Sequence, residues 1–169
     1  MMSRLRLCCL NLPSRSLAIS SSRRSFVALA KSSQTQTVRQ RKMSSLSVVS
    51  TPNAPAAIGP YSQAITLGNI VFVSGCIPID PATGDIVPGG IEEQAEQALK
   101  NLGEVVRASG SQVSKVAKTT VFLKNMNDFG TVNGIYAKFF GDHKPARSLV
   151  EVARLPKDVL FEIECIASL

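Results

Sequence analysis

The stretch "NIVFVSGCIPIDPATGDIVPGGIEEQAEQALKNLGEVVRASG", from Asn69 to Gly110, decides the fold class because its hydrophobic period changes once within it. Residues 69–79 are mostly apolar and β-branched, which predicts a buried strand. Residues 80–90 are rich in proline and glycine, which predicts turns. From residue 91 onward, apolar side chains recur with the spacing of one helix face, and Gly110 is placed to end that helix. The apolar positions of the predicted helix are Ile91, Ala95, Ala98, Leu99, Leu102, Val105 and Val106.

The segments on either side continue the succession of strands and helices. Residues 61–69 can pair with the buried strand through a turn at Gly68-Asn69. Residues 115–125 read as a strand, residues 129–140 as a helix ended by Gly141, and two further strands follow. The resulting order, ββ(β)–α–β–α–ββ, predicts one α+β domain over residues 46–169, with a mixed sheet and two helices on one face.

The sheet face without helices is also predicted to be apolar. We expect Leu149, Leu160 and Ile166 to lie on it. An uncovered apolar sheet face tends to associate, so the sequence predicts a homo-oligomer.

The positive charge of the chain belongs to its first 42 residues. Nine of the 19 basic residues precede Met43 and all 12 acidic residues follow it, so residues 43–169 carry 10 basic and 12 acidic side chains. The leader is rich in arginine and serine, has no acidic residue and has no apolar run long enough to span a bilayer, which is typical of an organelle transit peptide. We expect import into the mitochondrial matrix; plastid import and a plain disordered tail are the alternatives. A second start at Met43 would give a cytosolic form without the leader.

Cysteine and histidine are too few for most metal or nucleophile chemistry. Cys8 and Cys9 lie in the leader, Cys76 and Cys165 show no C-x-x-C spacing, and His143 is the single histidine. The sequence therefore predicts neither a zinc site nor a cysteine–histidine nucleophile, and it favours Cys76 and Cys165 as small buried side chains.

The last 26 residues, "KPARSLVEVARLPKDVLFEIECIASL", read as two consecutive strands that contain a cation and carboxylates. A hairpin with an even loop centred between Pro156 and Lys157 would set Arg147 opposite Ile166 and Glu151 opposite Glu162. Arg147 and Glu162 would then share one face of the sheet. The facing pair of carboxylates would raise one of their pKa values.

Four segments together resemble the RidA (YjgF) family of reactive-intermediate deaminases: "APAAIGPYSQA", "VFVSGCIPIDPATGDIV", "KTTVFLKNMNDFGTVNGIYAKFF" and "PARSLVEVARLPKDVLFEIE". With the leader attached, the chain resembles a fungal-type mitochondrial member. The resemblance implies a chorismate-mutase-like fold and a homotrimer whose sheets line a central barrel, with one site at each subunit cleft. It also implies hydrolysis of 2-imino and 2-enamino acids, such as 2-iminobutanoate and 2-iminopropanoate, to 2-oxo acids and ammonia, with no cofactor and no metal. Dehydratases that use pyridoxal phosphate would supply these imines.

The same resemblance assigns the two charged candidates. Arg147, in P-A-R, would grip the substrate carboxylate through two parallel hydrogen bonds, the alternative being a salt bridge to a nearby acid. Glu162 would orient and deprotonate the attacking water, the alternative being a solvated glutamate at a strand edge. Glu164, two residues further along the strand, would lie on the same face as Glu162 and is the other candidate for this role.

Four substrate-binding candidates also follow from the resemblance. Tyr61 would reach the cleft or else pack in the core, and Gly75 would let the backbone approach the ligand or else simply end a strand. Asn133 matches a family asparagine on the second helix, although it fits polar helix surface equally well. Leu149 stands where many bacterial members have a cysteine, so only a contact through its backbone N–H could be retained.

Two other functions remain open on the sequence. Some relatives are described as ribonucleases that inhibit translation, but residues 43–169 lack the basic stripe and the histidine pair that such an activity needs. The other is a trimer that binds 2-oxo acids without turnover or acts like a chaperone. Glu162 discriminates, because a pure carboxylate receptor has little use for an acid that positions water.

Overall fold

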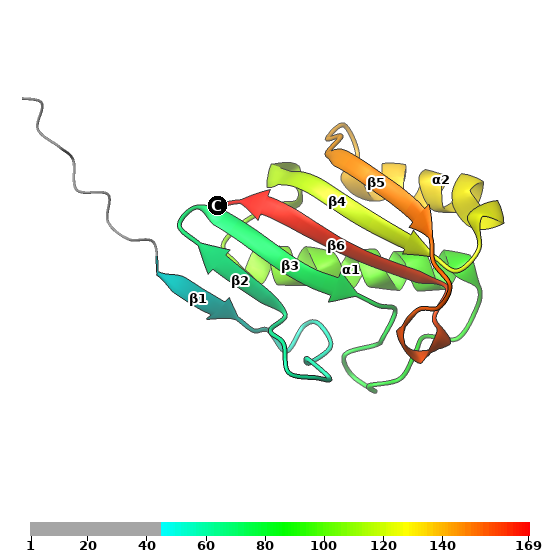
Figure 1. The fold of residues 1–169 in the computed structure, drawn as a ribbon, viewed down its shortest axis with the longest axis horizontal. Helices are drawn as coiled ribbons and strands as arrows, with labels where there is room; N and C mark the ends of the chain where they lie inside the picture. Colours follow the sequence, from blue (N-terminus) through cyan, green and yellow to red (C-terminus); the bar gives the residue numbers. More distant parts are fainter. Residues whose placement is uncertain (1–44) are drawn as a thin grey trace, which may run out of the picture. The chain divides into compact units, whose positions relative to one another are not determined.

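The computed structural model describes residues 45–169, which form one six-stranded sheet and two helices (Figure 1). The predicted transit peptide, residues 1–42, lies outside the described part. The strands are β1 (Leu46–Val49), β2 (Ala64–Leu67), β3 (Ile70–Cys76), β4 (Val116–Leu123), β5 (Ala146–Glu151) and β6 (Phe161–Ser168). The helices are α1 (Ile91–Ala108) and α2 (Phe129–Phe140), with short 3-10 turns at η1 (Val113–Lys115), η2 (Met126–Asp128) and η3 (Pro156–Asp158). Both helices and the order of elements confirm the α+β prediction.

The order of strands in the sheet is β1-β2-β3-β6-β4-β5, and only β4 and β5 run parallel. The predicted hairpin of the last two strands is therefore wrong, because β4 lies between β5 and β6. The β4–α2–β5 unit is a crossover, which sets β5 parallel beside β4. Strand β6 then occupies the centre of the sheet, between β3 and β4 (Figure 1).

Burial explains why β6 is central and β5 lies at the edge. Alternate β6 side chains are at most 3% exposed, so this strand has one fully buried face and two hydrogen-bonded neighbours. No side chain of β5 is fully buried. An edge position suits such a strand, since it pairs on one side only. The buried β6 residues are Phe161, Ile163, Cys165 and Ala167.

Helix α1 packs across β3 and β6, and α2 lies beside it on the same face of the sheet (Figure 1). The apolar stripe predicted for residues 91–106 faces the sheet, where Ala95, Leu99 and Leu102 are at most 1% exposed. Gly110 adopts a positive φ of 82°, which ends the helix as predicted.

The opposite face of the sheet, here called the open face, carries no helix and remains apolar. Seven large apolar side chains on it are between 37% and 70% exposed. They are Leu46, Val48, Leu67, Ile70, Phe72, Val150 and Ile166. The expectation for Ile166 is confirmed, whereas that for Leu149 is wrong: the register places Leu149 on the helix-covered face, packed against the core.

Within residues 45–169, no helix combines the length and the hydropathy that crossing a membrane requires.

Candidate functional site

Arg147 lies on β5, directly opposite Thr119 of β4, with its side chain on the helix-covered face. Its guanidinium carbon is 4.6 Å from the centroid of the Tyr136 ring on α2. The other arginines of the described part, Arg107 and Arg154, pair with carboxylates. Arg147 has no such partner among residues 45–169, and the leader contains no acidic residue that could supply one. The structure therefore does not favour the alternative of a structural salt bridge.

The hollow beside this guanidinium, here called the Arg147 hollow, is lined by Asn133, Tyr136, Ala137, Phe140, Gly141, His143, Lys144, Pro145 and Arg147. None of these side chains is acidic. Asn133, a substrate-binding candidate from the resemblance, is one of the lining residues. His143 Nε2 lies 2.6 Å from the Val116 carbonyl oxygen and donates to it, so one ring nitrogen is engaged in structure. The Arg147 hollow is a cationic and polar recess suited to a small carboxylate.

Glu162 lies on the open face of β6 and lines a second recess, here called the Glu162 hollow. Its other lining residues are Ile58, Tyr61, Ser74, Gly75, Ile77 and Pro156. Partial burial raises the pKa of Glu162, and the nearby carboxylate of Glu164 raises it further. A carboxylate with a raised pKa beside a recess has the properties of a general base.

The carboxylate that raises the pKa of Glu162 is that of Glu164, not that of Glu151 as predicted. Glu151 does not face Glu162, because β4 separates their strands and the Glu151 carboxylate accepts a hydrogen bond of 2.7 Å from the Met126 N–H. Glu164 is the neighbouring acid on the open face. It borders a different hollow, with Lys118 and Thr120, and is exposed to solvent.

Gly75 makes room for the Glu162 carboxylate. A β-carbon at position 75 would lie 2.9 Å from Cδ of Glu162 and closer still to Oε1. The backbone of Gly75 is not in the left-handed region, so space rather than conformation requires glycine here. The position falls within an irregular part of the β3–β6 pairing, between Val73 and Cys76.

Substituting Gly75 by alanine is expected to displace the carboxylate and to lower turnover by at least about tenfold, because a general base must stay within hydrogen-bond reach of its proton. The melting temperature should change little, since the clashing group is the far end of a flexible and partly exposed side chain. Gly134→Ala is the matched control, because open space surrounds that position. Wild-type turnover in Gly75→Ala would show that the observed carboxylate position is not the active one.

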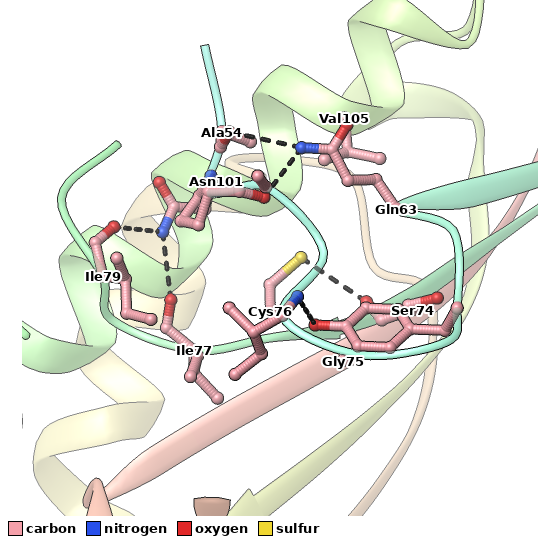
Figure 2. A pocket seen from close by; sticks show the side chains of 13 residues that line it. Ala54, Gln63, Ser74, Gly75, Cys76, Ile77, Ile79, Asn101 and Val105 are labelled. Carbon is pink, nitrogen blue, oxygen red and sulfur yellow. Dashed lines mark hydrogen bonds between the residues drawn. The ribbon is translucent and has the colours of Figure 1, made fainter. Parts of the chain in front are cut away.

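A small cavity lies behind the Glu162 hollow and shares Tyr61, Ser74, Gly75 and other lining residues with it. Two buried amides hold its walls (Figure 2). Gln63 Nε2 donates to the carbonyls of Ala54 and Pro55 at 3.2 and 2.7 Å. Asn101 Nδ2 donates to those of Ile77 and Ile79 at 3.0 and 2.8 Å. These bonds hold in place Ala54, Pro55, Ile77 and Ile79, which line the small cavity.

The structure separates the candidate residues into two groups. Arg147 and Asn133 line one hollow, whereas Tyr61, Gly75 and Glu162 line the other. The predicted common face for Arg147 and Glu162 is wrong, because the register puts Arg147 on the helix-covered face and Glu162 on the open face. Leu149 lines neither hollow. Tyr61 is 49% exposed, so it is not core.

Sequence reasoning missed two contributors. Tyr136 is not among the candidates named from the sequence, although its spacing of three residues from Asn133 places both on one side of α2. Pro156 lies in η3, far from Gly75 in sequence, and no local pattern connects the two.

Among residues 45–169, no group of three or more histidine, cysteine, aspartate or glutamate side chains could hold a metal ion. Burial raises the pKa of the Cys165 thiol to about 12 and that of Cys76 even further, so neither thiol is set up as a nucleophile.

Comparison with known proteins shows the class to which this arrangement belongs. The family model described as Endoribonuclease L-PSP matches residues 51–169. The chain therefore belongs to this family, which is the RidA (YjgF) family that its motifs resemble.

Individual relatives agree along nearly their whole length. A RutC family protein of Pyrococcus horikoshii is 57% identical over 120 residues, which cover 71% of this chain and 95% of the relative. The 2-iminobutanoate/2-iminopropanoate deaminase of Escherichia coli K12 is 55% identical over 122 residues, covering 70% of this chain and 94% of the relative. The crystal structure of E. coli TdcF with bound serine matches with a TM-score of 0.70 and 48% identity, covering 73% of this chain and 98% of that one.

Proposed function

We propose that this protein is a hydrolytic deaminase that converts 2-imino and 2-enamino acids, such as 2-iminobutanoate and 2-iminopropanoate, to 2-oxo acids and ammonia. The observation that carries the proposal is the pairing of two chemically complementary hollows. One presents an arginine that has no carboxylate partner among residues 45–169, and the other presents a carboxylate with a raised pKa. The naming of the E. coli relative supports the same chemistry.

In the proposed reaction, Arg147 binds the substrate carboxylate through its planar fork of N–H donors. Glu162 orients a water molecule and takes a proton from it as the water oxygen bonds to the imine carbon. Glu162 passes this proton to the imine nitrogen, which gives a carbinolamine. Glu162 then carries the hydroxyl proton of the carbinolamine to the amino nitrogen as the C=O bond forms and the C–N bond breaks, and the nitrogen leaves as ammonia. Water is the only co-reactant, and Glu162 ends in its starting protonation state.

We further propose that each active site joins the Arg147 hollow of one subunit to the Glu162 hollow of the next in a homotrimer. Two features support this arrangement. The hollows face opposite sides of one sheet, so a single ligand cannot easily touch both within one chain. A ring of identical subunits brings together two different surfaces at every interface, and the exposed apolar side chains of the open face provide surface to bury there.

A coupled assay tests the activity. A threonine dehydratase generates 2-iminobutanoate, which semicarbazide traps as a semicarbazone with a measurable absorbance. Adding this protein is expected to slow semicarbazone formation in proportion to its concentration, because hydrolysis removes the imine first. An unchanged trapping rate at every protein concentration would contradict the proposal.

The family description also names an endoribonuclease, so RNA cleavage is the alternative to imine hydrolysis. Residues 43–169 have more acidic than basic side chains, which disfavours binding to phosphate backbones. The single imidazole, His143, is engaged with a backbone carbonyl. These observations favour the deaminase. A carboxylate receptor without turnover would use Arg147 but not Glu162. The effects of Glu162→Gln and Arg147→Lys on turnover and on binding therefore distinguish such a receptor from an enzyme.

We propose that residues 1–42 direct import into the mitochondrial matrix and that a start at Met43 gives a cytosolic form. The arginine-rich composition without acids supports this. A fusion of residues 1–42 to a fluorescent protein should colocalise with a matrix marker; cytosolic or plastid fluorescence would contradict the proposal.

A chain beginning at Met43 is expected to fold, assemble and turn over as the processed protein does, because the core and both hollows lie within residues 49–167. Sedimentation should give the same number of subunits per oligomer for the shortened chain as for the processed protein. Insolubility of the shortened chain, or its sedimentation as a monomer, would show that the leader contributes to the fold.

A further inference from the structure

The guanidinium of Arg147 rests on an aromatic ring. At 4.6 Å from the centroid of Tyr136, the cation is attracted by the electron-rich face of the ring. The other arginines of the described part are held by Glu104 and Asp158 instead. Unlike a salt bridge, this contact places no competing carboxylate at the N–H donors of Arg147, so they can bind a substrate carboxylate.

Tyr136 is itself held from two sides. Its hydroxyl lies 2.8 Å from Oγ1 of Thr119, and both groups are buried. Its ring lies against Phe140, with centroids 4.4 Å apart. Thr119 is fully buried and is the direct neighbour of Arg147 in the parallel β4–β5 pairing. Thr119, Tyr136 and Arg147 therefore contact one another pairwise. Strand pairing joins Thr119 to Arg147, the hydroxyl bond joins Thr119 to Tyr136, and the cation–ring contact joins Tyr136 to Arg147.

We propose that Tyr136 is a positioning residue for substrate binding: held by Thr119, its ring fixes the Arg147 guanidinium in the orientation that accepts the substrate carboxylate. The inference rests on the proposed function, because it takes Arg147 as the carboxylate ligand. Tyr136 acts through Arg147 and touches neither the water nor the imine carbon. Its loss therefore raises KM and weakens product binding, while kcat changes much less.

The experiment measures 2-oxobutanoate affinity by calorimetry, and KM and kcat in the trapping assay, for Tyr136→Leu, Arg147→Lys and the double variant. Tyr136→Leu is expected to weaken affinity and raise KM by about tenfold, the scale of a desolvated cation–ring contact, with kcat within about threefold of wild type. On the Arg147→Lys background the same leucine substitution is expected to cost less than about threefold, because residues that act through one another are not additive. Phe139→Leu is the control, since Phe139 is an aromatic residue of the same helix that packs on Phe140 rather than Arg147.

Each contrary result has a distinct meaning. A folded Tyr136→Leu protein with wild-type affinity overturns the inference while the proposed function stands. Equal losses on the wild-type and Arg147→Lys backgrounds overturn it as well, because they show a merely structural role. Wild-type affinity in Arg147→Lys itself removes Arg147 as the carboxylate ligand, and the proposed carboxylate grip fails together with the inference.

If Tyr136→Leu does not fold, the hydroxyl pair provides the test. Tyr136→Phe and Thr119→Val each leave one buried hydroxyl without its partner, and each is expected to weaken 2-oxobutanoate binding by about threefold. Together they remove both hydroxyls, so the double variant is expected to lose no more affinity than either single one. Unchanged affinity in both single variants, or simple multiplication of their losses in the double variant, would overturn the inference.

Discussion

Glu162→Gln is expected to lower turnover by about 10²–10⁴-fold, the usual contribution of a general acid–base group. Glutamine keeps the shape of the side chain over Gly75 but cannot take a proton from water. Affinity for 2-oxobutanoate should persist, because the carboxylate grip lies in the Arg147 hollow, on the other face of the sheet. Turnover in the trapping assay and product affinity by calorimetry together separate chemistry from binding.

Glu164→Gln is the matched control for this variant. Glu164 lies two residues along β6 on the same face but borders a different hollow, so its substitution should leave turnover close to wild type. Full activity in Glu162→Gln together with a loss in Glu164→Gln would exchange their roles. Weaker product binding and a lower melting temperature in Glu162→Gln would instead indicate that Glu162 has a structural role.

The raised pKa of Glu162 gives this prediction a pH dependence. The carboxylate form is active, so kcat/KM, corrected for uncatalysed hydrolysis, should rise with pH and level off above a pKa higher than the ordinary 4.5 of glutamic acid. For stability the sign is opposite: folding favours the protonated form, so this contribution is complete below the ordinary pKa and is lost as pH rises through the raised one. Glu162→Gln should therefore gain stability relative to wild type as the pH rises from acidic to neutral.

Arg147→Lys is expected to lower kcat/KM by roughly 5- to 150-fold, which corresponds to about 1–3 kcal/mol for a hydrogen bond between charged groups. Lysine keeps the positive charge but loses the planar fork that binds a carboxylate through two parallel bonds. It also loses the guanidinium that lies over the Tyr136 ring. The trapping assay measures the effect, most of which should fall on KM.

Arg154→Lys is the control for charge-conserving substitution. Arg154 is exposed and bonds both carboxylate oxygens of Asp158, at 2.7 and 2.8 Å, away from either hollow. Arg154 lines neither hollow, so activity should not change. Near wild-type activity in Arg147→Lys would show that Arg147 is structural.

Local sequence patterns were sufficient to predict the helices and most of the strands. The apolar spacing from Ile91 to Val106 and the glycine at 110 defined α1 almost to the residue. The pairing of β5 with β4 rather than with β6 could not be predicted from these patterns, because a hairpin and an inserted central strand have the same local signature. The two arrangements differ in whether β6 pairs with one strand or with two. That number depends on the whole sheet and not on the local sequence.

The resemblance named individual candidate residues but could not give their arrangement. Arg147, Asn133, Tyr61, Gly75 and Glu162 all border hollows. Through β4, Arg147 is level with Cys165 rather than Ile166, and this shift of one residue puts Arg147 and Glu162 on opposite faces. The expected single cluster therefore became two. Contacts that depend on packing, such as Tyr136 beneath Arg147 and Glu162 over Gly75, have no linear signature.

The most direct test of the composite site mixes two inactive chains. Arg147→Ala and Glu162→Gln subunits carrying different affinity tags are coexpressed, and trimers containing both are purified through the two tags in succession. In a mixed ring, one interface pairs an intact Arg147 hollow with an intact Glu162 hollow, so turnover should recover to about one third of wild type. Mixed trimers as inactive as either parent would contradict the account, because they would show that both groups must come from the same chain.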